Sequence, residues 1–222
     1  RNVSIGGATL YEEIELFFYI AEKIPLKNVI FVIPFNLYNS NNRYNKISET
    51  IDIINNPFKY YLSEFIAKVS ILILYNKVMN SDLKIGKPKM SKDEFWKFQL
   101  GPDITGSYYY QWTYPKDLIF KLHDIKKICD SRNIKMIILI PPTHIDLQKK
   151  VKDYGLEEEY IEYKKILSSI APVIDYDFPS ALTRNKDNFS DPYHIKSDIG
   201  KMIVSNMLGD DCIYCRKYDN HN

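Results

Sequence analysis

An aspartate and a histidine separated by two residues lie near the carboxyl end of the chain, in Asp191-Pro192-Tyr193-His194. At this spacing a carboxylate can reach the imidazole, fix its tautomer and stabilise its charged form. A histidine held in this way acts as a general base when a hydroxyl nucleophile lies nearby. The pattern Asp-x-x-His often occurs by chance, and a histidine before a helix is more commonly a surface or capping residue. Its place between the last predicted strand and the last predicted helix favours the catalytic interpretation.

The elements that must position this pair alternate between strand and helix. Apolar, β-branched runs predict strands at 3–5, 28–35, 135–140 and 172–176, and the second of these is expected to be buried on both faces. Helical spacing of apolar residues predicts helices at 11–23, 57–78, 115–132, 156–171 and 198–208. This order indicates an α/β fold with a mainly parallel sheet flanked by helices, because parallel neighbours need crossover connections. The length suits one domain, 1–222, with a helical and aromatic insertion at about 57–115. The part of this insertion between Asn80 and Pro115 is expected to pack over the sheet.

Polar residues and glycines follow the predicted strands. They lie in Ser4-Ile5-Gly6-Gly7, in Pro34-Phe35-Asn36, in Pro141-Pro142-Thr143-His144 and in the loop that carries Asp191 and His194. Ligands of open α/β sheets bind at the carboxyl ends of the strands. We therefore expect these segments to converge at one edge of the sheet.

The same segments resemble the sequence blocks of the SGNH (GDSL-like) hydrolases. The last block of that family reads Asp-x-x-His before a helix with a glycine, as in residues 188–200 here. Its glycine block is similar to residues 2–9, and its asparagine block is similar to residues 34–36. The likeness is closest to the polysaccharide O-acetyltransferases of the alginate type and the D-alanylation protein of teichoic acids. It implies a flavodoxin-like, three-layer architecture.

The resemblance also implies roles for individual residues in acyl transfer. A serine would attack an ester carbonyl, with His194 as its base and Asp191 orienting the imidazole. The backbone N–H of Gly6 or Gly7 and the side-chain amide of Asn36 would bind the developing oxyanion. Without the resemblance, Asn36 is equally well explained as a turn residue, and the two glycines as a tight strand-to-helix turn.

The family's nucleophilic serine, in Gly-Asp-Ser or Gly-x-Ser-Arg, has no counterpart in this sequence. The simplest account is that the numbered chain begins after it, and that the preceding segment also holds a membrane anchor or signal. The alternative is that Ser4 is the nucleophile in a degenerate first block. Little chain precedes Ser4 to form a strand, and the single helix between Ser4 and Asn36 fits adjacent second and third blocks better. A third account is a domain that has lost the serine and only binds.

We therefore expect an extracytoplasmic esterase or O-acyltransferase that acts on a cell-surface glycan or acylated polymer, anchored through a segment before Arg1 and paired with a membrane acyltransferase. The alternative is a catalytically inactive carbohydrate-binding or assembly partner on the same fold. An unrelated flavodoxin-like domain would need a glycine-rich phosphate turn. Residues 4–9 contain neither Gly-x-Gly-x-x-Gly nor a P-loop lysine.

The composition argues against a nucleic-acid-binding protein and against a metal site. The 30 basic and 28 acidic residues leave a net charge of +2, without the basic excess of a nucleic-acid-binding protein. The four histidines are not spaced with carboxylates as metal ligands are, so no metal or cofactor is expected. His144 is either a substrate contact or a loop histidine without a role.

The three cysteines and the most apolar segment point to burial and to a local pair of thiols. Cys129 falls in a helical pattern and is expected to be buried, whereas Cys212 and Cys215 form either a local disulfide or an incidental pair. The apolar run Val69–Tyr75 is too short to span a membrane and is expected to be part of a buried helix.

Overall fold

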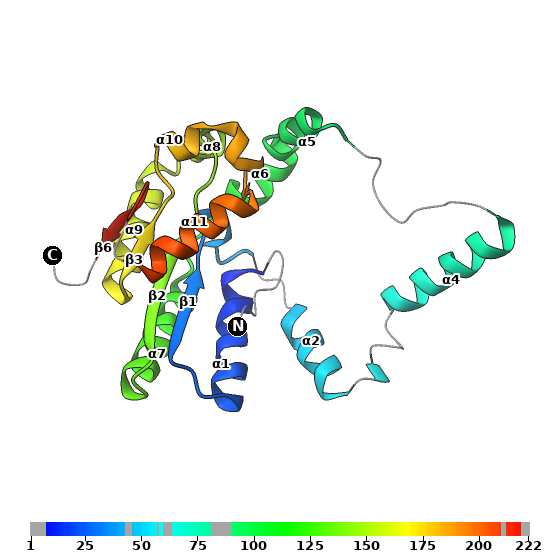
Figure 1. The fold of residues 1–222 in the computed structure, drawn as a ribbon, viewed down its shortest axis with the longest axis horizontal. Coiled ribbons are helices and arrows are strands. Elements are labelled where there is room, and N and C mark those ends of the chain that lie inside the picture. The colour runs from blue at the N-terminus through cyan, green and yellow to red at the C-terminus, as the bar shows by residue number, and fades with distance from the viewer. Residues whose placement is uncertain are drawn as a thin grey trace. The chain divides into compact units, whose positions relative to one another are not determined.

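The computed structural model describes residues 8–42, 46–56, 58–59, 64–80, 90–209 and 212–218 (Figure 1). The chain forms two compact units, one from residues 1–44 together with 91–222 and the other from Asn45–Met90. The second unit overlaps the insertion predicted at about 57–115, but it begins earlier and ends sooner. The aromatic half of the predicted insertion belongs to the first unit.

A four-stranded sheet of order β1-β2-β3-β6 lies in the first unit. β1 pairs in parallel with β2, β2 pairs in parallel with β3, and β6 pairs antiparallel with β3. These strands span Asn28–Val32 (β1), Lys135–Ile140 (β2), Val173–Asp175 (β3) and Arg216–Tyr218 (β6). The prediction of an α/β fold with a mostly parallel sheet is confirmed. β6 was not predicted, because two of its three residues are charged and it has no apolar run.

The helices of the first unit include those predicted and several short ones that were not. They are α1 (Leu10–Lys23), η1 (Phe35–Leu37), α5 (Lys92–Gln99), α6 (Pro102–Tyr109), α7 (Lys116–Ser131), α8 (Ile145–Asp153), α9 (Glu157–Ile170), α10 (Ala181–Arg184), η2 (Lys186–Asn188) and α11 (Ser197–Leu208). A two-stranded hairpin is formed by β4 (Phe189–Asp191) and β5 (His194–Ile195). The second unit contains α2 (Lys46–Asn55) and α4 (Glu64–Met79).

Local capping explains where some of these helices begin. The Thr9 hydroxyl accepts the N–H of Glu12, and the Glu12 carboxylate accepts the N–H of Thr9, which starts α1. Ser91 and Glu94 form the same capping box at the start of α5. The Ser-x-x-Glu spacing at Ser91 was therefore a readable signal for a helix in a region where the apolar pattern is weak.

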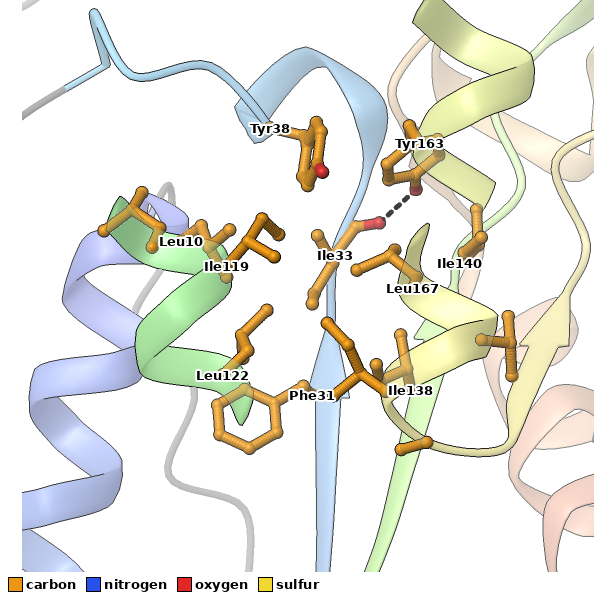
Figure 2. Packing of buried hydrophobic residues seen from close by; sticks show 14 of the residues in the cluster. Leu10, Phe31, Ile33, Tyr38, Ile119, Leu122, Ile138, Ile140, Tyr163 and Leu167 are labelled. Carbon is orange, nitrogen blue, oxygen red and sulfur yellow. Dashed lines mark hydrogen bonds between the residues drawn. The ribbon is translucent and has the colours of Figure 1, made fainter. Parts of the chain in front are cut away.

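The residues of β2 show how the core divides between the two faces of the sheet. Met136, Ile138 and Ile140 point into the larger cluster, which packs α1, α7 and α9 against the sheet. Leu139 and Ile174 point the other way, into a smaller cluster under α11 and α5. Figure 2 shows the larger cluster, in which Leu122 of α7 and Leu167 of α9 approach β1 and β2. The hydroxyl of Tyr163 closes its upper end by donating to the carbonyl of Ile33 at 2.5 Å.

Two predictions about burial are wrong. β1 is buried on only one face, since Phe31 is buried while Ile30 is 48% exposed, because the helices of the second face gather over β2 and β3. The apolar run within α4 is helical as predicted but is not buried, with Ile71 66% and Leu74 62% exposed. Apolar residues lie on all sides of α4, so a single contact face cannot cover them.

The cysteines are distributed as follows. Cys129 is free and buried in the core, as predicted. Cys212 and Cys215 form a disulfide just before β6. The side-chain amide of Asn206, from α11, donates to the carbonyl of Ile213 inside this small ring and to the hydroxyl of Tyr176 after β3. The disulfide loop is thereby tied to both α11 and the sheet.

Helix α7 offers a matched test of the core. Leu122 is fully buried, whereas Phe120, two residues earlier, is 58% exposed. Leu122→Ala is expected to lower the free energy of unfolding by about 2–5 kcal/mol, because it removes buried methyl groups and leaves a cavity. Phe120→Ala is expected to change it by about 0.5 kcal/mol or less. Urea denaturation of the two variants checks this, and equal losses would contradict the described packing of α7.

Candidate active site

The hairpin β4–β5 places Asp191 and His194 opposite each other across a tight turn. Its register pairs Asp191 with His194, while Pro192 and Tyr193 form the turn. One carboxylate oxygen of Asp191 accepts the backbone N–H of Tyr193 at 2.9 Å and that of His194 at 3.1 Å. These bonds are local, so the carboxylate is held by its own turn. The fully buried ring of Phe189 anchors the other end of β4 in the smaller core cluster.

The carboxylate of Asp191 contacts the imidazole of His194 through both of its oxygens. Nδ1 of His194 lies 2.9 Å from Oδ1 and 2.8 Å from Oδ2. Because an ionised carboxylate only accepts hydrogen bonds, Nδ1 must carry a proton. A neutral His194 ring therefore presents the lone pair of Nε2 on the side away from Asp191. The side chain of His194 is 71% exposed while that of Asp191 is only 10% exposed, so the free nitrogen is open to solvent.

Both pKa values move in the direction that an acid–base pair requires. Burial raises the pKa of the Asp191 carboxyl, but the hydrogen bonds from the His194 ring and from the Tyr193 N–H outweigh it and hold that pKa below its usual value. The hydrogen bond to Asp191 raises the pKa of His194 above its ordinary value, against a smaller opposing effect of partial burial. Asp191 is therefore ionised at neutral pH, and it stabilises the protonated imidazole.

The turn is joined to the carboxyl end of β2. The backbone N–H of His144 donates to the carbonyl of Pro192 at 2.9 Å. The ring of His144 is buried between Trp96 and Phe189, with ring centroids at 4.8 and 5.4 Å, and its Nδ1 accepts the N–H of Asp146 at the start of α8. Burial lowers the pKa of His144, more than the nearby Asp146 raises it. His144, a candidate substrate contact on sequence grounds, is a buried helix cap beside the candidate catalytic pair.

A buried carboxylate, Asp177, ties the ends of β2 and β3 together. One oxygen of Asp177 accepts the backbone N–H of Thr143 at 2.9 Å, its hydroxyl at 2.6 Å and the side-chain amide of Gln148 at 3.0 Å. The other oxygen accepts the hydroxyl of Tyr160 at 2.8 Å. These donors come from the loop after β2, from α8 and from α9.

A second buried carboxylate supports the first. Asp175 accepts the N–H of Asp177 at 2.7 Å and pairs with the ammonium of Lys164 at 2.8 Å. Lys164 also donates to the backbone carbonyl of Asp177. Burial raises the pKa of the Asp175 carboxyl, and Lys164 opposes this shift without cancelling it. The Asp-x-Asp spacing at the end of β3 was the only sequence signal for this network, and Asp177 was missed.

The carboxyl end of β1 reaches the same edge through aromatic side chains. Asn36 is 7% exposed in η1, directly after β1, and its carbonyl accepts the side chain of Asn42 at 2.9 Å. The side chain of Asn39 donates to the carbonyl of Tyr108 at 3.0 Å. The ring of Tyr108 in turn contacts that of Tyr193, with centroids 5.6 Å apart. The loop after β1 is thus connected through α6 to the turn between Asp191 and His194.

The structure brings some of the predicted site residues together, while others lie outside the described residues. Asp191 and His194 are in direct contact, and His144 and Asn36 lie at the ends of the two neighbouring strands. Ser4, Gly6 and Gly7 lie outside the described residues. Within the described residues, Nε2 of His194 has no hydrogen-bond partner, and no group of three or more His, Cys, Asp or Glu side chains is arranged to hold a metal ion.

The aromatic segment at the end of α6 and just after it is divided between core and surface. Tyr109 is buried and stacks on Phe35 of η1 with ring centroids 6.1 Å apart. Trp112 also stacks on Phe35, at 5.7 Å, whereas Tyr110 is 70% exposed. This segment therefore closes the larger core cluster at the edge of the sheet where the candidate site lies.

Comparisons with known proteins add no relative. No protein-family model, curated protein or solved structure matches the chain. Among the described helices, none combines the length and apolarity that crossing a membrane requires.

The Asp191–His194 contact predicts a measurable titration. The pKa of His194, followed by NMR of its ring protons, is expected to lie above 6.5, and Asp191→Asn is expected to lower it. The pair stabilises the fold most strongly between pH 3.8 and pH 6.5, which are the pKa values of the two side chains in the unfolded chain. Its contribution is lost as pH falls through the lowered pKa of Asp191 or rises through the raised pKa of His194. Asp198→Asn, at an exposed aspartate of α11, is the control, and an equal shift in both variants would refute the contact.

Removal of the Asp177 carboxylate tests the network between the strand ends. Asp177→Ala is expected to lower the free energy of unfolding by about 3 kcal/mol or more, because it leaves the Thr143 and Tyr160 donors buried without an acceptor. Asp187→Ala, at an exposed position nearby, is expected to change it by about 0.5 kcal/mol or less. Chemical denaturation measures both. A loss below about 1 kcal/mol for Asp177→Ala would show that the donors find other partners.

Proposed function

We propose that this protein is an SGNH-like esterase or O-acyltransferase that transfers an acyl group at a cell-surface glycan or polymer. The observation that carries the proposal is the contact of His194 Nδ1 with both oxygens of Asp191, which leaves Nε2 open to solvent. A base of this kind must be neutral, correctly oriented and accessible to a hydroxyl group. The described geometry meets the requirements of orientation and accessibility. The raised pKa of His194 makes the ring a stronger base, which acts once the pH exceeds that pKa and the ring is neutral.

In the proposed reaction, Nε2 of His194 takes the proton of the serine hydroxyl as its oxygen attacks the ester carbonyl. The imidazolium that forms is stabilised by the ionised Asp191, which keeps its own negative charge. The same proton then goes to the departing alkoxide when the ester C–O bond breaks, leaving an acyl-serine. Water or a glycan hydroxyl attacks this ester in the second half of the reaction, again with His194 as the base.

The nucleophile and the oxyanion donors remain assigned by the resemblance of the sequence. Asn36 follows β1, and its side-chain amide has no hydrogen bond to a described residue. This is compatible with a donor kept for a substrate oxygen. Ser4, or a serine that precedes Arg1 in a longer chain, would supply the nucleophile, and the N–H of Gly6 or Gly7 would supply the second donor.

The arrangement of the strand ends supports this proposal over a lone, incidental histidine. Hydrogen bonds run from the turn at Pro192 to His144, and from Thr143 to Asp177 after β3. This places the acid–base pair at the carboxyl edge of the parallel strands, where ligands of open α/β sheets bind. An extracytoplasmic location, a membrane anchor and a membrane acyltransferase partner belong to the same proposal.

Turnover of p-nitrophenyl acetate tests the catalytic role. His194→Ala is expected to lower kcat/KM by about 10³-fold or more, because the serine hydroxyl loses its base. His123→Ala replaces an exposed histidine of α7 and is expected to leave the rate unchanged. In the parent protein, kcat/KM is expected to rise with pH through a value above 6.5, as His194 loses its proton.

The alternative function and the identity of the nucleophile are separated by the same assay. Equal turnover by the parent chain and His194→Ala would favour a catalytically inactive carbohydrate-binding or assembly partner. Loss of turnover in Ser4→Ala, with folding unchanged by circular dichroism, would identify Ser4 as the nucleophile. If Ser4→Ala remains as active as the parent, another nucleophile of the assayed chain carries the reaction. If the 222-residue chain shows no turnover, a chain extended before Arg1 is the next protein to assay.

A further inference from the structure

Helix α4 presents large apolar side chains to solvent on all sides. Ile71, Ile73, Leu74, Val78 and Met79 are between 59 and 79% exposed. At about 100° per residue, Ile71, Leu74 and Val78 lie along one stripe, whereas Ile73 and Met79 point to other sides of the helix. A globular contact covers one face of a helix, so an occupant that covers only the stripe leaves the other side chains in water.

Charge is concentrated in the same unit. Residues 45–90 contain seven lysines against four acidic residues, a net charge of +3, whereas the other 176 residues carry 23 basic and 24 acidic residues, a net charge of −1. The positive charge of the whole chain therefore comes from its most apolar helix and the segments beside it. Lys68 and Lys77 are exposed on α4 itself, on nearly opposite sides of the helix.

We propose that this second unit binds to the surface of membranes that contain anionic lipid, with α4 as the inserted element. Acyl chains can cover a helix on every side, and they can do so without a complementary groove. Lysine stems can extend along the apolar surface and keep the ammonium groups at the phosphate level. The exposed ring of Tyr75 suits the same boundary, because the ring is apolar and its hydroxyl is polar.

The length of α4 fixes the manner of binding. Its 16 residues extend over about 24 Å, which is less than the hydrocarbon thickness of about 30 Å. This agrees with the absence of a membrane-crossing helix among the described residues. The helix therefore lies within one leaflet. The proposal is independent of the acyl-transfer activity, which is assigned to side chains of the first unit.

A second copy of the chain is the competing occupant. Ala67, Ile71, Leu74 and Val78 have the alternating spacing of four and three residues found in helix pairs. A two-helix pair through this stripe leaves Ile73, which is 61% exposed, in water on another side. It also gives the net charge of +3 no role, since it brings two basic units together. Lipid accounts for both observations, so the lipid surface is favoured.

Vesicle co-sedimentation of the whole 222-residue chain tests the proposal. Binding is expected to vesicles of equal phosphatidylglycerol and phosphatidylcholine, to be at least about tenfold weaker on phosphatidylcholine alone, and to weaken as salt is added. Ile71→Glu combined with Leu74→Glu is expected to reduce binding at least about tenfold, because it places charges at the acyl level. Lys68→Gln combined with Lys77→Gln is expected to reduce binding to the anionic vesicles only.

A matched control separates α4 from other exposed apolar residues. Phe120→Glu combined with Ile161→Glu makes the same change at two positions of the first unit that are 58 and 56% exposed. This variant is expected to bind vesicles like the parent, and all three double variants are expected to keep the parent's circular dichroism spectrum. Equal loss in this control, or equal binding to neutral and anionic vesicles, would overturn the proposal. A dimer that Ile71→Glu dissociates, detected by light scattering without vesicle binding, would overturn it in favour of the second copy.

Discussion

The carboxylate of Asp177 holds the edge of the sheet on which the candidate site depends. It accepts hydrogen bonds from the backbone and side chain of Thr143, from Gln148 and from Tyr160. Without an acceptor at this point, the loop after β2 and helices α8 and α9 would contain donors without a partner. Each buried donor left unpaired costs about 1–3 kcal/mol. One buried carboxyl group thus supplies the acceptor for donors from three segments of the chain.

The loop after β2, held by Asp177, in turn positions the turn that carries the candidate acid–base pair. His144 follows Thr143 directly, caps α8 with its ring and donates its N–H to Pro192 inside the turn that carries Asp191 and His194. The pair therefore combines two environments, a carboxylate that is buried and satisfied and an imidazole that is mostly exposed. This division suits a proton carrier, because its charge is stabilised from the inside while its reactive nitrogen stays accessible.

The two units differ in how their apolar residues are used. In the first unit, alternate residues of β2 serve opposite faces of the sheet, and helices cover both clusters. In α4, apolar residues occupy every side of the helix and stay exposed. The spacing of apolar residues along the chain predicts a helix. Burial of that helix also requires a neighbouring surface of matching shape. The run Val69–Tyr75 therefore predicted the helix correctly and its surroundings wrongly.

The sequence by itself determined the elements with strong local signals. The apolar run at Lys135–Ile140 gave β2 at its observed bounds, and the Asp-x-x-His spacing gave the contact between Asp191 and His194, because three residues and a turn suffice to form it. Short or polar elements escaped prediction, among them α8 and the three-residue β6, since their stability comes from neighbours far along the chain.

Tertiary structure alone decided the role of residues whose partners are remote. In the sequence, Asp177 is one loop aspartate among others. Only the folded chain brings Thr143 and Tyr160 within hydrogen-bond distance of its carboxyl oxygens. His144 is similar, since only the folded chain places Trp96 and Phe189 on either side of its ring and makes it a buried cap. Local spacing predicts contacts within a turn, but contacts between distant segments depend on which strands lie side by side, and that is set by the packing of the whole sheet.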